Sequence, residues 1–273
     1  RAVGGVVAMR RNTATNAGSL RENAHVFASG AVERLLAATD AEIEARADLI
    51  NARAEAGWVR RVHGDLHLEN IFLDEAGRPT PFDAIEFDDL LATVDVVMDV
   101  AFLLMDLVRV GETRAANRVL NVWLDRMARV DAKAAYEGLA LLPLCLSCRA
   151  AVRAHVRARL STILEGEAST RAAVEARGYL ERAQAWLAPP PPRLVAIGGR
   201  SGTGKSTLFR MISGMEPPDA GSIELGEGLW ALRPGSNGSG TADVSLLEKN
   251  AVDFLGAALI DHDRKIAPAI VVI

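Results

Sequence analysis

The sequence predicts an α+β fold that is mostly helical, followed by a partial α/β module of strand, glycine-rich loop and helix. Apolar residues recur at helical spacing over long stretches that enclose a short strand-rich patch, and a glycine-rich motif stands between an apolar run and a helical run. Four consecutive prolines at 189–192 deny the backbone four amide donors and favour a stiff linker. We therefore expect a first unit at 1–187, a linker at 188–192 and a second, incomplete unit at 193–273.

The first unit is expected to contain a helix, a small strand-rich patch and then a helical bundle. Apolar residues at helical spacing predict a helix over about 31–55, which Gly57 would end. Brief strands are expected at 59–62, 71–73 and 80–82. A turn at Gly77 would join the last two strands. From Asp95 the pattern is helical almost to the linker, with breaks expected near Gly111, Val130 and Glu165.

The second unit is expected to begin with a strand and a helix. The apolar run at 193–198 predicts the strand, and 205–212 predicts the helix. The apolar run at 267–273 predicts a further buried strand, which needs a partner element.

Composition excludes several classes of protein. The 273 residues carry 31 Lys and Arg against 35 Asp and Glu, a net charge of −4, which argues against binding nucleic acid through bulk charge. The hydrophobic fraction of 49% argues against a disordered chain. The most apolar stretch, 90–110, contains Asp95, Asp99 and Asp106, so we expect a buried helix there and no membrane span.

Two cysteines, Cys145 and Cys148, lie in an apolar and basic helical stretch. No second cysteine pair accompanies them and no strand precedes them, so we interpret them as core thiols and not as a zinc or redox site. The chain shows no signal peptide at its start, and we expect a cytoplasmic location.

Two carboxylate side chains and one amide side chain lie in or beside the expected strand-rich patch. Asp65 is followed five residues later by Asn70, and Asp83 comes thirteen residues after that. Phosphoryl transfer from ATP needs such a set: a carboxylate that orients and deprotonates an acceptor hydroxyl, and oxygen ligands that hold Mg²⁺ on the phosphates.

The segment His63-Gly64-Asp65-Leu66-His67-Leu68-Glu69-Asn70 and its downstream Asp resemble the catalytic loop and metal-binding Asp of the aminoglycoside phosphotransferase group. The resemblance implies a protein-kinase-like C-terminal lobe over 1–187 and an ATP-dependent kinase for a small hydroxylated acceptor. It implies Asp65 as catalytic base, His63 as a brace of the loop, and Asn70 and Asp83 as Mg²⁺ ligands. Asp99 matches a helix acid that is structural in that group.

Two features depart from that pattern, and two alternative interpretations compete with it. Only 62 residues precede His63, so the N-terminal lobe with its glycine-rich loop and Lys–Glu pair is expected to be absent. Glu69 replaces the usual Gly and places an acid beside Asn70, which we expect to reshape Mg²⁺ binding. His63, Asp65 and His67 could instead alternate on a half-buried strand. A metallophosphoesterase is a weaker alternative, because the other histidines lack that group's motif neighbours.

The strongest motif is Gly199-Arg200-Ser201-Gly202-Thr203-Gly204-Lys205-Ser206, which fits the P-loop pattern at every position between a predicted strand and helix. Its backbone N–H groups would cradle phosphates, Lys205 would reach the β and γ phosphates of ATP, and Ser206 would ligate Mg²⁺. The expected cofactor-binding residues are Gly199, Ser201, Gly202, Thr203, Gly204, Lys205, Ser206 and Thr207.

With both halves in order, the chain resembles bacterial bifunctional aminoglycoside phosphotransferase/ATP-binding proteins. After Thr207 the resemblance changes to ATP-binding cassette ATPases, which share the helix at 208–214 and the motif at 217–226. The signature motif and the Q-loop of those ATPases are not found. Asp261 has the bare form of a Walker B acid, but His262 follows where a Glu would supply the hydrolytic base.

Three hypotheses follow for the protein. The first is an ATP-dependent phosphotransferase fused to a P-loop module, with ATP and Mg²⁺ as cofactors. The second is a non-catalytic ATP-binding protein or ABC-type ATPase fragment in which the P-loop alone functions, for which a partner subunit is conceivable. The third is a truncated or recombined chain.

Overall fold

The structure, a computed structural model, describes residues 4–188 continuously, and beyond them residues 207, 210–211, 230–232 and 269–271. The chain divides into two compact units, one of residues 1–106 and 141–188 and the other of residues 107–140 and 189–273. The division expected from the sequence, with 107–140 in the first unit, stays a prediction.

Three helices open the first unit: α1 (Val6–Glu22), α2 (Ala31–Ala45) and α3 (Ala47–Glu55). The single helix predicted over 31–55 is interrupted at Arg46, whose φ of −108° and ψ of 9° lie outside the helical region. The predicted end at Gly57 is confirmed, because Gly57 follows α3 with a φ of +78° that favours glycine. A short turn of 3₁₀ helix, η1 (Ala24–Val26), connects α1 with α2.

The strand-rich patch forms two small antiparallel pairs. Strand β1 (Val59–Arg61) pairs with β4 (Thr93–Asp95), and β2 (Ile71–Leu73) pairs with β3 (Pro79–Pro81). The three predicted strands are therefore confirmed to within one or two residues at their ends. The β2–β3 hairpin closes through the turn at Asp74, whose backbone N–H donates to the Arg78 carbonyl at 3.0 Å.

The apolar stretch at 90–110 is not one helix. It comprises α4 (Asp89–Ala92), strand β4 and α5 (Val96–Arg109). The Asp88 carboxylate caps α4 by accepting from two backbone N–H groups, and Asp95 in β4 accepts from Val97 at the start of α5. The predicted break near Gly111 is confirmed, with a φ of +86°.

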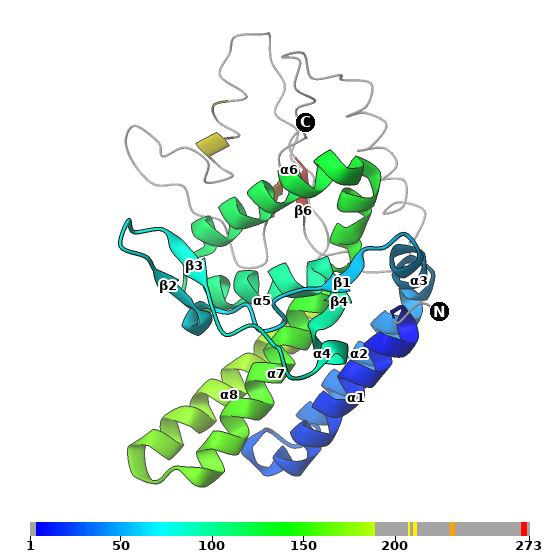
Figure 1. The fold of residues 1–273 in the computed structure, drawn as a ribbon. Helices are drawn as coiled ribbons and strands as arrows, with labels where there is room; N and C mark the ends of the chain where they lie inside the picture. Colours follow the sequence, from blue (N-terminus) through cyan, green and yellow to red (C-terminus); the bar gives the residue numbers. More distant parts are fainter. Residues whose placement is uncertain (1–3, 189–206, 208–209, 212–229, 233–268, 272–273) are drawn as a thin grey trace. The chain divides into compact units, whose positions relative to one another are not determined.

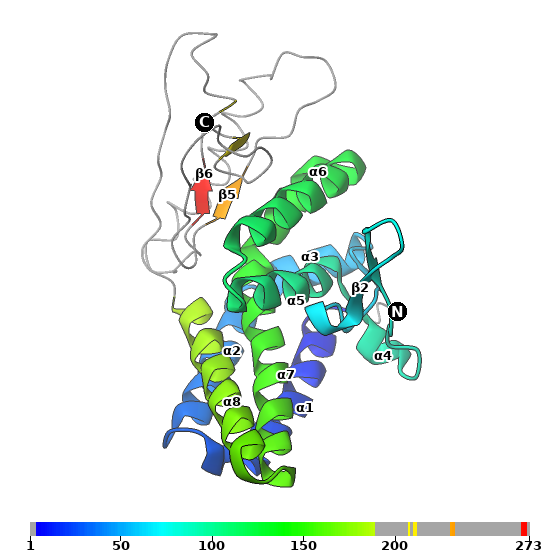
Figure 2. The same ribbon diagram turned by 90° about the vertical axis from the view of Figure 1, so that its left-hand side faces the viewer.

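Two long antiparallel helices, α7 (Leu142–Ile163) and α8 (Gly166–Leu187), complete the first unit and pack along each other (Figures 1 and 2). Pro143 lies in the first turn of α7, where its missing N–H costs no helical hydrogen bond. Helices α1 and α2 pack against this pair, as both views show. The core between these elements is made of fully buried side chains that include Leu20, Leu35, Ile43, Phe102, Leu104, Met105, Leu144 and Leu146.

In the second unit the structure describes α6 (Thr113–Glu137), the short η3 (Gly138–Leu141), and strands β5 (Trp230–Leu232) and β6 (Ala269–Val271). Helix α6 is kinked at Asp131, one residue after the predicted break, and β5 pairs with β6 in parallel. Strand β6 falls within the run predicted as a strand. The strand predicted at 193–198, the prolines at 189–192 and the candidate acid Asp261 lie outside the described residues.

One continuous helical stretch of the described chain, Thr113–Ile163, is long and apolar enough to cross a membrane. Its most apolar window is 72% buried, as in the core helix of a folded protein, so length and composition alone do not assign it to a membrane.

Candidate functional site

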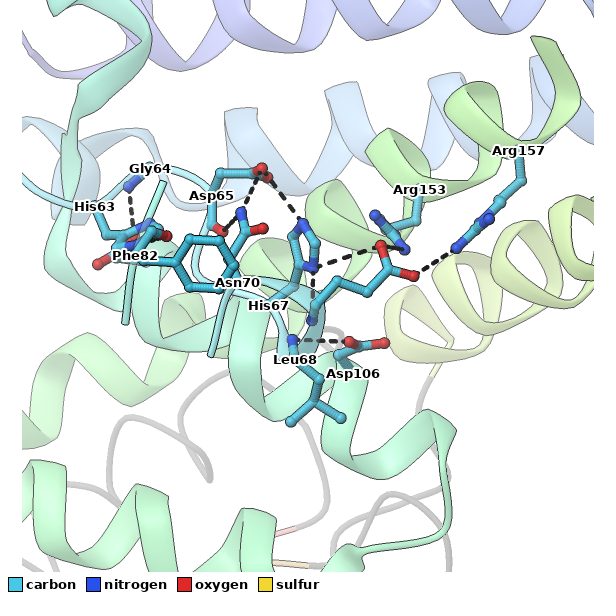
Figure 3. Close-up of polar contacts among 12 residues, drawn as sticks. His63, Gly64, Asp65, His67, Leu68, Asn70, Phe82, Asp106, Arg153 and Arg157 are labelled. Atoms are coloured by element: carbon cyan, nitrogen blue, oxygen red, sulfur yellow. Dashed lines mark hydrogen bonds and ion pairs between the residues drawn. The ribbon is translucent and has the colours of Figure 1, made fainter. Parts of the chain in front are cut away.

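The loop that follows β1 is anchored through two adjacent residues, His63 and Gly64. Gly64 has a φ of +82°, and its backbone N–H donates to Asp99 Oδ1 at 2.9 Å. The His63 ring lies 2.9 Å, through Nε2, from the carbonyl oxygen of Phe82 just after β3 (Figure 3). The ring therefore bridges the loop and the segment that carries Asp83, a geometry that suits a brace.

Asp65 and Asn70, predicted to work together, lie in direct contact. Asn70 is buried, and its Nδ2 donates at 3.0 Å both to the Asp65 carbonyl oxygen and to Asp65 Oδ2 (Figure 3). Among the described residues none donates to Asp65 Oδ1 or to Asn70 Oδ1. Within the part of the chain that the structure describes, each residue thus keeps one side-chain oxygen without a hydrogen-bond donor.

His67 is a second residue that contacts the Asp65 carboxylate. Its Nε2 lies 3.3 Å from Asp65 Oδ2, and its Nδ1 accepts from the backbone N–H of Glu69 at 3.2 Å. Only 5% of the residue is exposed, and its ring packs against Phe102 with centroids 5.2 Å apart. An Nδ1 that accepts carries no proton, so Nε2 is the protonated nitrogen and donates to Asp65.

The charge on Asp65 is stabilised by its neighbours. Burial by itself would raise the pKa of this carboxyl, but the hydrogen bonds from His67 and Asn70 and the positive charge of Arg149 outweigh burial and hold the pKa below its ordinary value. Asp65 is therefore ionised at neutral pH, as a group that accepts a hydrogen bond from a substrate hydroxyl must be.

Asp83 lies at the end of the β3 segment with an unusual backbone. Its φ of +59° is in the left-handed region, which non-glycine residues adopt at an energetic cost, and such strain concentrates at functional positions. The preceding Phe82 is fixed on both sides, since its N–H donates to the Asn70 carbonyl at 3.0 Å and its carbonyl faces His63. The Asp83 side chain is exposed and makes no hydrogen bond or ion pair with any described residue.

Glu69, the acid expected to reshape Mg²⁺ binding beside Asn70, is paired with two arginines. Its carboxylate accepts from Arg153 Nη2 at 2.9 Å and from Arg157 Nη2 at 2.7 Å, both on α7 (Figure 3). Burial alone would raise the pKa of Glu69, but these two arginines lower it, the hydrogen bond from Arg153 most strongly. Its charge is therefore neutralised away from the candidate metal ligands.

The sequence analysis missed the arginines of α7 and the acid on α5. Arg149, Arg153 and Arg157 recur every four residues and so lie along one face of α7, a spacing that could have been noticed. The fully buried Asp106 accepts from the Leu68 backbone N–H at 3.0 Å, and Tyr179 Oη lies 3.5 Å from its other oxygen. The loop is thus held from α5 and from α7.

The oxygen donors at this loop suit Mg²⁺ better than a transition metal. The described residues contain no group of three or more His, Cys, Asp or Glu side chains placed to hold a metal. The unpaired Asn70 Oδ1 and the exposed Asp83 carboxylate are hard oxygen donors, and Mg²⁺ is commonly bound by one or two such ligands together with substrate phosphates and water. The loop therefore fits an Mg²⁺ ion that arrives with a nucleotide.

The predicted phosphate-binding residues Gly199, Ser201, Gly202, Thr203, Gly204, Lys205 and Ser206 lie outside the described residues. Thr207, Arg210 and Met211 are described and helical, as predicted for the segment after the P-loop.

Comparison with known proteins supports the P-loop half most clearly. The model of the ABC transporter family matches residues 187–249, which include the whole glycine-rich motif. The energy-dependent translational throttle protein EttA of Escherichia coli K12 is 63% identical over 38 residues, 14% of this chain and 7% of EttA. The ATP-binding protein ChvD of Rhizobium radiobacter is 55% identical over 38 residues, 14% of this chain and 13% of ChvD. The resemblance to ATP-binding cassettes is thereby confirmed, and it implies binding of ATP with Mg²⁺.

A longer similarity extends into the first half. An uncharacterized protein of Mycobacterium tuberculosis H37Rv is 31% identical over 211 residues, 77% of this chain and 40% of the relative. The chain spans less than half of that relative's length. Because 62 of the 273 residues lie outside the match, a continuous match includes positions 63–211 and hence both the His63 loop and the P-loop. No solved structure matches the chain.

None of the matches named above carries a kinase or phosphotransferase description. They favour the hypothesis of an ABC-type ATP-binding protein over that of a phosphotransferase.

Proposed function

We propose that this chain is an ABC-type ATP-binding protein that binds Mg²⁺-ATP through the P-loop at 199–206. The observation that carries the proposal is the match of the ABC transporter family to 187–249, around a motif that is complete at every position. Backbone N–H groups of the glycine-rich turn and the start of the following helix would bind the phosphates. Lys205 would contact the β and γ phosphates, and Ser206 would ligate Mg²⁺.

Binding of ATP is the form of this function that the residues support, because the P-loop is complete at every position. His262 follows Asp261, the candidate Walker B acid, where a hydrolytic Glu is expected. Cys145 and Cys148, both free and buried, suit the reducing cytoplasm, where ATP and Mg²⁺ are abundant, and we place the protein there.

A nucleotide titration of the full chain tests this proposal. Lys205→Ala should weaken Mg²⁺-ATP binding by at least tenfold, because the variant loses a charge-assisted contact with two phosphates. Lys133→Ala is the matched control, since Lys133 is an exposed lysine whose partner is Glu137 on the same helix. Equal affinity of Lys205→Ala and wild type would refute the proposal.

A second candidate function is phosphoryl transfer at the His63 loop, and the geometry of Asn70 favours it. Its amide donates both protons to Asp65, which leaves Asn70 Oδ1 and Asp65 Oδ1 open. Asp65 Oδ1 would accept the proton of an acceptor hydroxyl as its oxygen bonds to the γ-phosphorus of ATP, while the bond from that phosphorus to the β,γ-bridging oxygen breaks and ADP leaves. Asn70 and Asp83 would hold Mg²⁺, which when bound neutralises charge on the transferred phosphate. The acceptor would be a small hydroxylated molecule.

The two functions are separated by different variants. Asp65→Asn retains shape but removes the base, and should abolish Mg²⁺-ATP-dependent phosphorylation of hydroxylated acceptors while nucleotide binding at the P-loop persists. Asp74→Asn, in the turn of the β2–β3 hairpin, controls for loss of an acid elsewhere. Absence of transfer to every acceptor tested with wild type, or unchanged transfer by Asp65→Asn, would eliminate this candidate.

A further inference from the structure

We propose that Glu69 is a positioning residue that, through the η2 turn (Leu68–Asn70), keeps the proton of His67 on Nε2 and directed at Asp65. The inference rests on the second candidate function, because it concerns the group that would act as base there. It assigns a role to the one loop position that departs from the phosphotransferase pattern.

The first step is the attachment of Glu69. Both carboxylate oxygens are engaged, Oε2 by Arg153 at 2.9 Å and Oε1 by Arg157 at 2.7 Å. Arg157 is itself held by Glu175 on α8, with Nε 3.2 Å from Glu175 Oε2. Figure 3 shows Arg153 and Arg157 extending from one helix toward the loop. Glu69 is therefore tied to the rigid α7–α8 pair, although its side chain is 55% exposed.

The second step is the effect on the backbone. The Leu68 N–H donates to the buried Asp106 on α5, and the Glu69 carboxylate is bound by Arg153 on α7. The first two residues of η2 are therefore attached to two different helices. This double attachment sets the direction of the Glu69 backbone N–H, which points at His67 Nδ1 from 3.2 Å. A small residue at 69 would remove the attachment of the turn to α7, leaving Leu68 bonded to Asp106 and Asn70 bonded to Asp65 and Phe82.

The third step is the proton on His67. Two groups of Glu69 face Nδ1: its backbone N–H at 3.2 Å, and its Oε2 at 4.0 Å, which is too far to accept a hydrogen bond from the ring. We therefore infer that the neutral ring carries its proton on Nε2 and donates to Asp65 Oδ2. Asp65 Oδ2 therefore accepts hydrogen bonds from both His67 and Asn70, and Asp65 Oδ1 is the oxygen that a substrate hydroxyl could reach. Glu69 thus selects, through His67, which oxygen of Asp65 is free.

The test reads the location of the His67 proton by nitrogen NMR of the full chain with labelled histidine. His67→Gln identifies the signal among the five histidines of the sequence. Wild type should show Nε2 protonated and Nδ1 unprotonated, and Glu69→Ala should show a mixture of both tautomers. Glu69→Gln, which keeps an acceptor for one arginine, should restore most of the wild-type pattern. A wild-type proton on Nδ1, or an unchanged His67 signal in Glu69→Ala, would overturn the inference.

The matched control is Glu33→Ala. Glu33 forms a comparable bidentate pair with Arg21, at 2.8 and 2.9 Å, and its side chain is 61% exposed. This variant should leave the His67 signal unchanged, whereas a change equal to that of Glu69→Ala would show a general effect of lost ion pairs and overturn the inference.

Measurement of phosphoryl-transfer rates distinguishes failure of the positioning role of Glu69 from failure of the transfer function itself. If wild type transfers phosphate, Glu69→Ala should lower kcat about tenfold, within the range known for outer partners of catalytic groups, with KM for ATP unchanged. Unchanged kcat would refute the positioning role while leaving the transfer function intact. If wild type transfers no phosphate, the second candidate function fails, and the NMR result alone decides whether Glu69 positions His67.

Discussion

Arg53 on α3 and Asp95 on β4 form a buried bidentate ion pair. Arg53 Nε lies 2.7 Å from Asp95 Oδ2, and Nη2 lies 2.9 Å from Oδ1. The residues are 3% and 8% exposed, and the guanidinium stacks 4.9 Å from the centroid of the Trp58 ring. Asp95 Oδ1 also accepts from the Val97 N–H, so this pair joins a helix, a strand and the start of α5.

Removal of the Asp95 carboxylate should therefore destabilise the first unit strongly. Asp95→Ala leaves a buried guanidinium without its counter-charge, and losses of this kind are about 3–5 kcal/mol in the free energy of unfolding. Denaturant unfolding measures the loss. Asp89→Ala, which removes an exposed pair with Arg61 at 3.6 Å, should cost less than about 1 kcal/mol. Equal costs for the two variants would contradict the burial argument.

Gly64 should tolerate substitution less well than Gly77. Both have positive φ, +82° and +73°, so alanine at either site carries a strain of about 1–2 kcal/mol. A Cβ at Gly64 would also approach Ile85 Cδ1 to 3.0 Å, whereas one at Gly77 meets no atom within 4 Å. Thermal unfolding should show Gly64→Ala to be the more destabilised. If Gly64→Ala were as stable as Gly77→Ala, the Ile85 side chain would have to move away from the new Cβ without any loss in the free energy of unfolding.

The two cysteines should be unreactive in the folded protein. Burial raises the pKa of Cys148 from 9.0 to about 12 and raises that of Cys145 well above its ordinary value. Because these folded-state pKa values are raised, the stability they contribute is complete below pH 9 and is lost as the pH rises toward 12.

Alkylation at pH 8 should label neither thiol until denaturant unfolds the chain, and both should then react. Rapid labelling of native protein at this pH would show that α7 opens locally far more often than its burial implies.

The Glu69 ion pairs should contribute a measurable acid dependence. The folded-state pKa of Glu69 is lowered from 4.5, so its stabilising effect is present above that pH and is lost as the pH falls through the folded value. Wild type should therefore unfold at a higher temperature than Glu69→Gln at pH 7, and the difference should shrink below about pH 4.5. A difference that is the same at pH 7 and pH 3 would exclude the charge of Glu69 as its source.

Local sequence signals located the strands and helix ends, because glycine, proline and apolar spacing act within a few residues. They also predicted that Asp65 and Asn70 act together, which follows from their five-residue separation in a loop. The signals failed where an interruption had no local marker, as at Arg46, and where strand pairing was non-local, as between β1 and β4. The ion pairs of Glu69 were not predicted because its partners, Arg153 and Arg157, are 84 and 88 residues away.

The sequence by itself determined that the chain carries a complete P-loop, which the match to the ABC transporter family supports. It also predicted an Asp–Asn–Asp set with a spacing that suits phosphoryl transfer to a hydroxyl. These are decided by residue type at short separations, which folding does not alter. Only the tertiary structure decided how the charges near Asp65 are used, because an ion pair or a buried hydrogen bond depends on which distant helices reach the loop. It ties Glu69 to α7 through Arg153 and Arg157, and it places His67 Nε2 3.3 Å from Asp65 Oδ2.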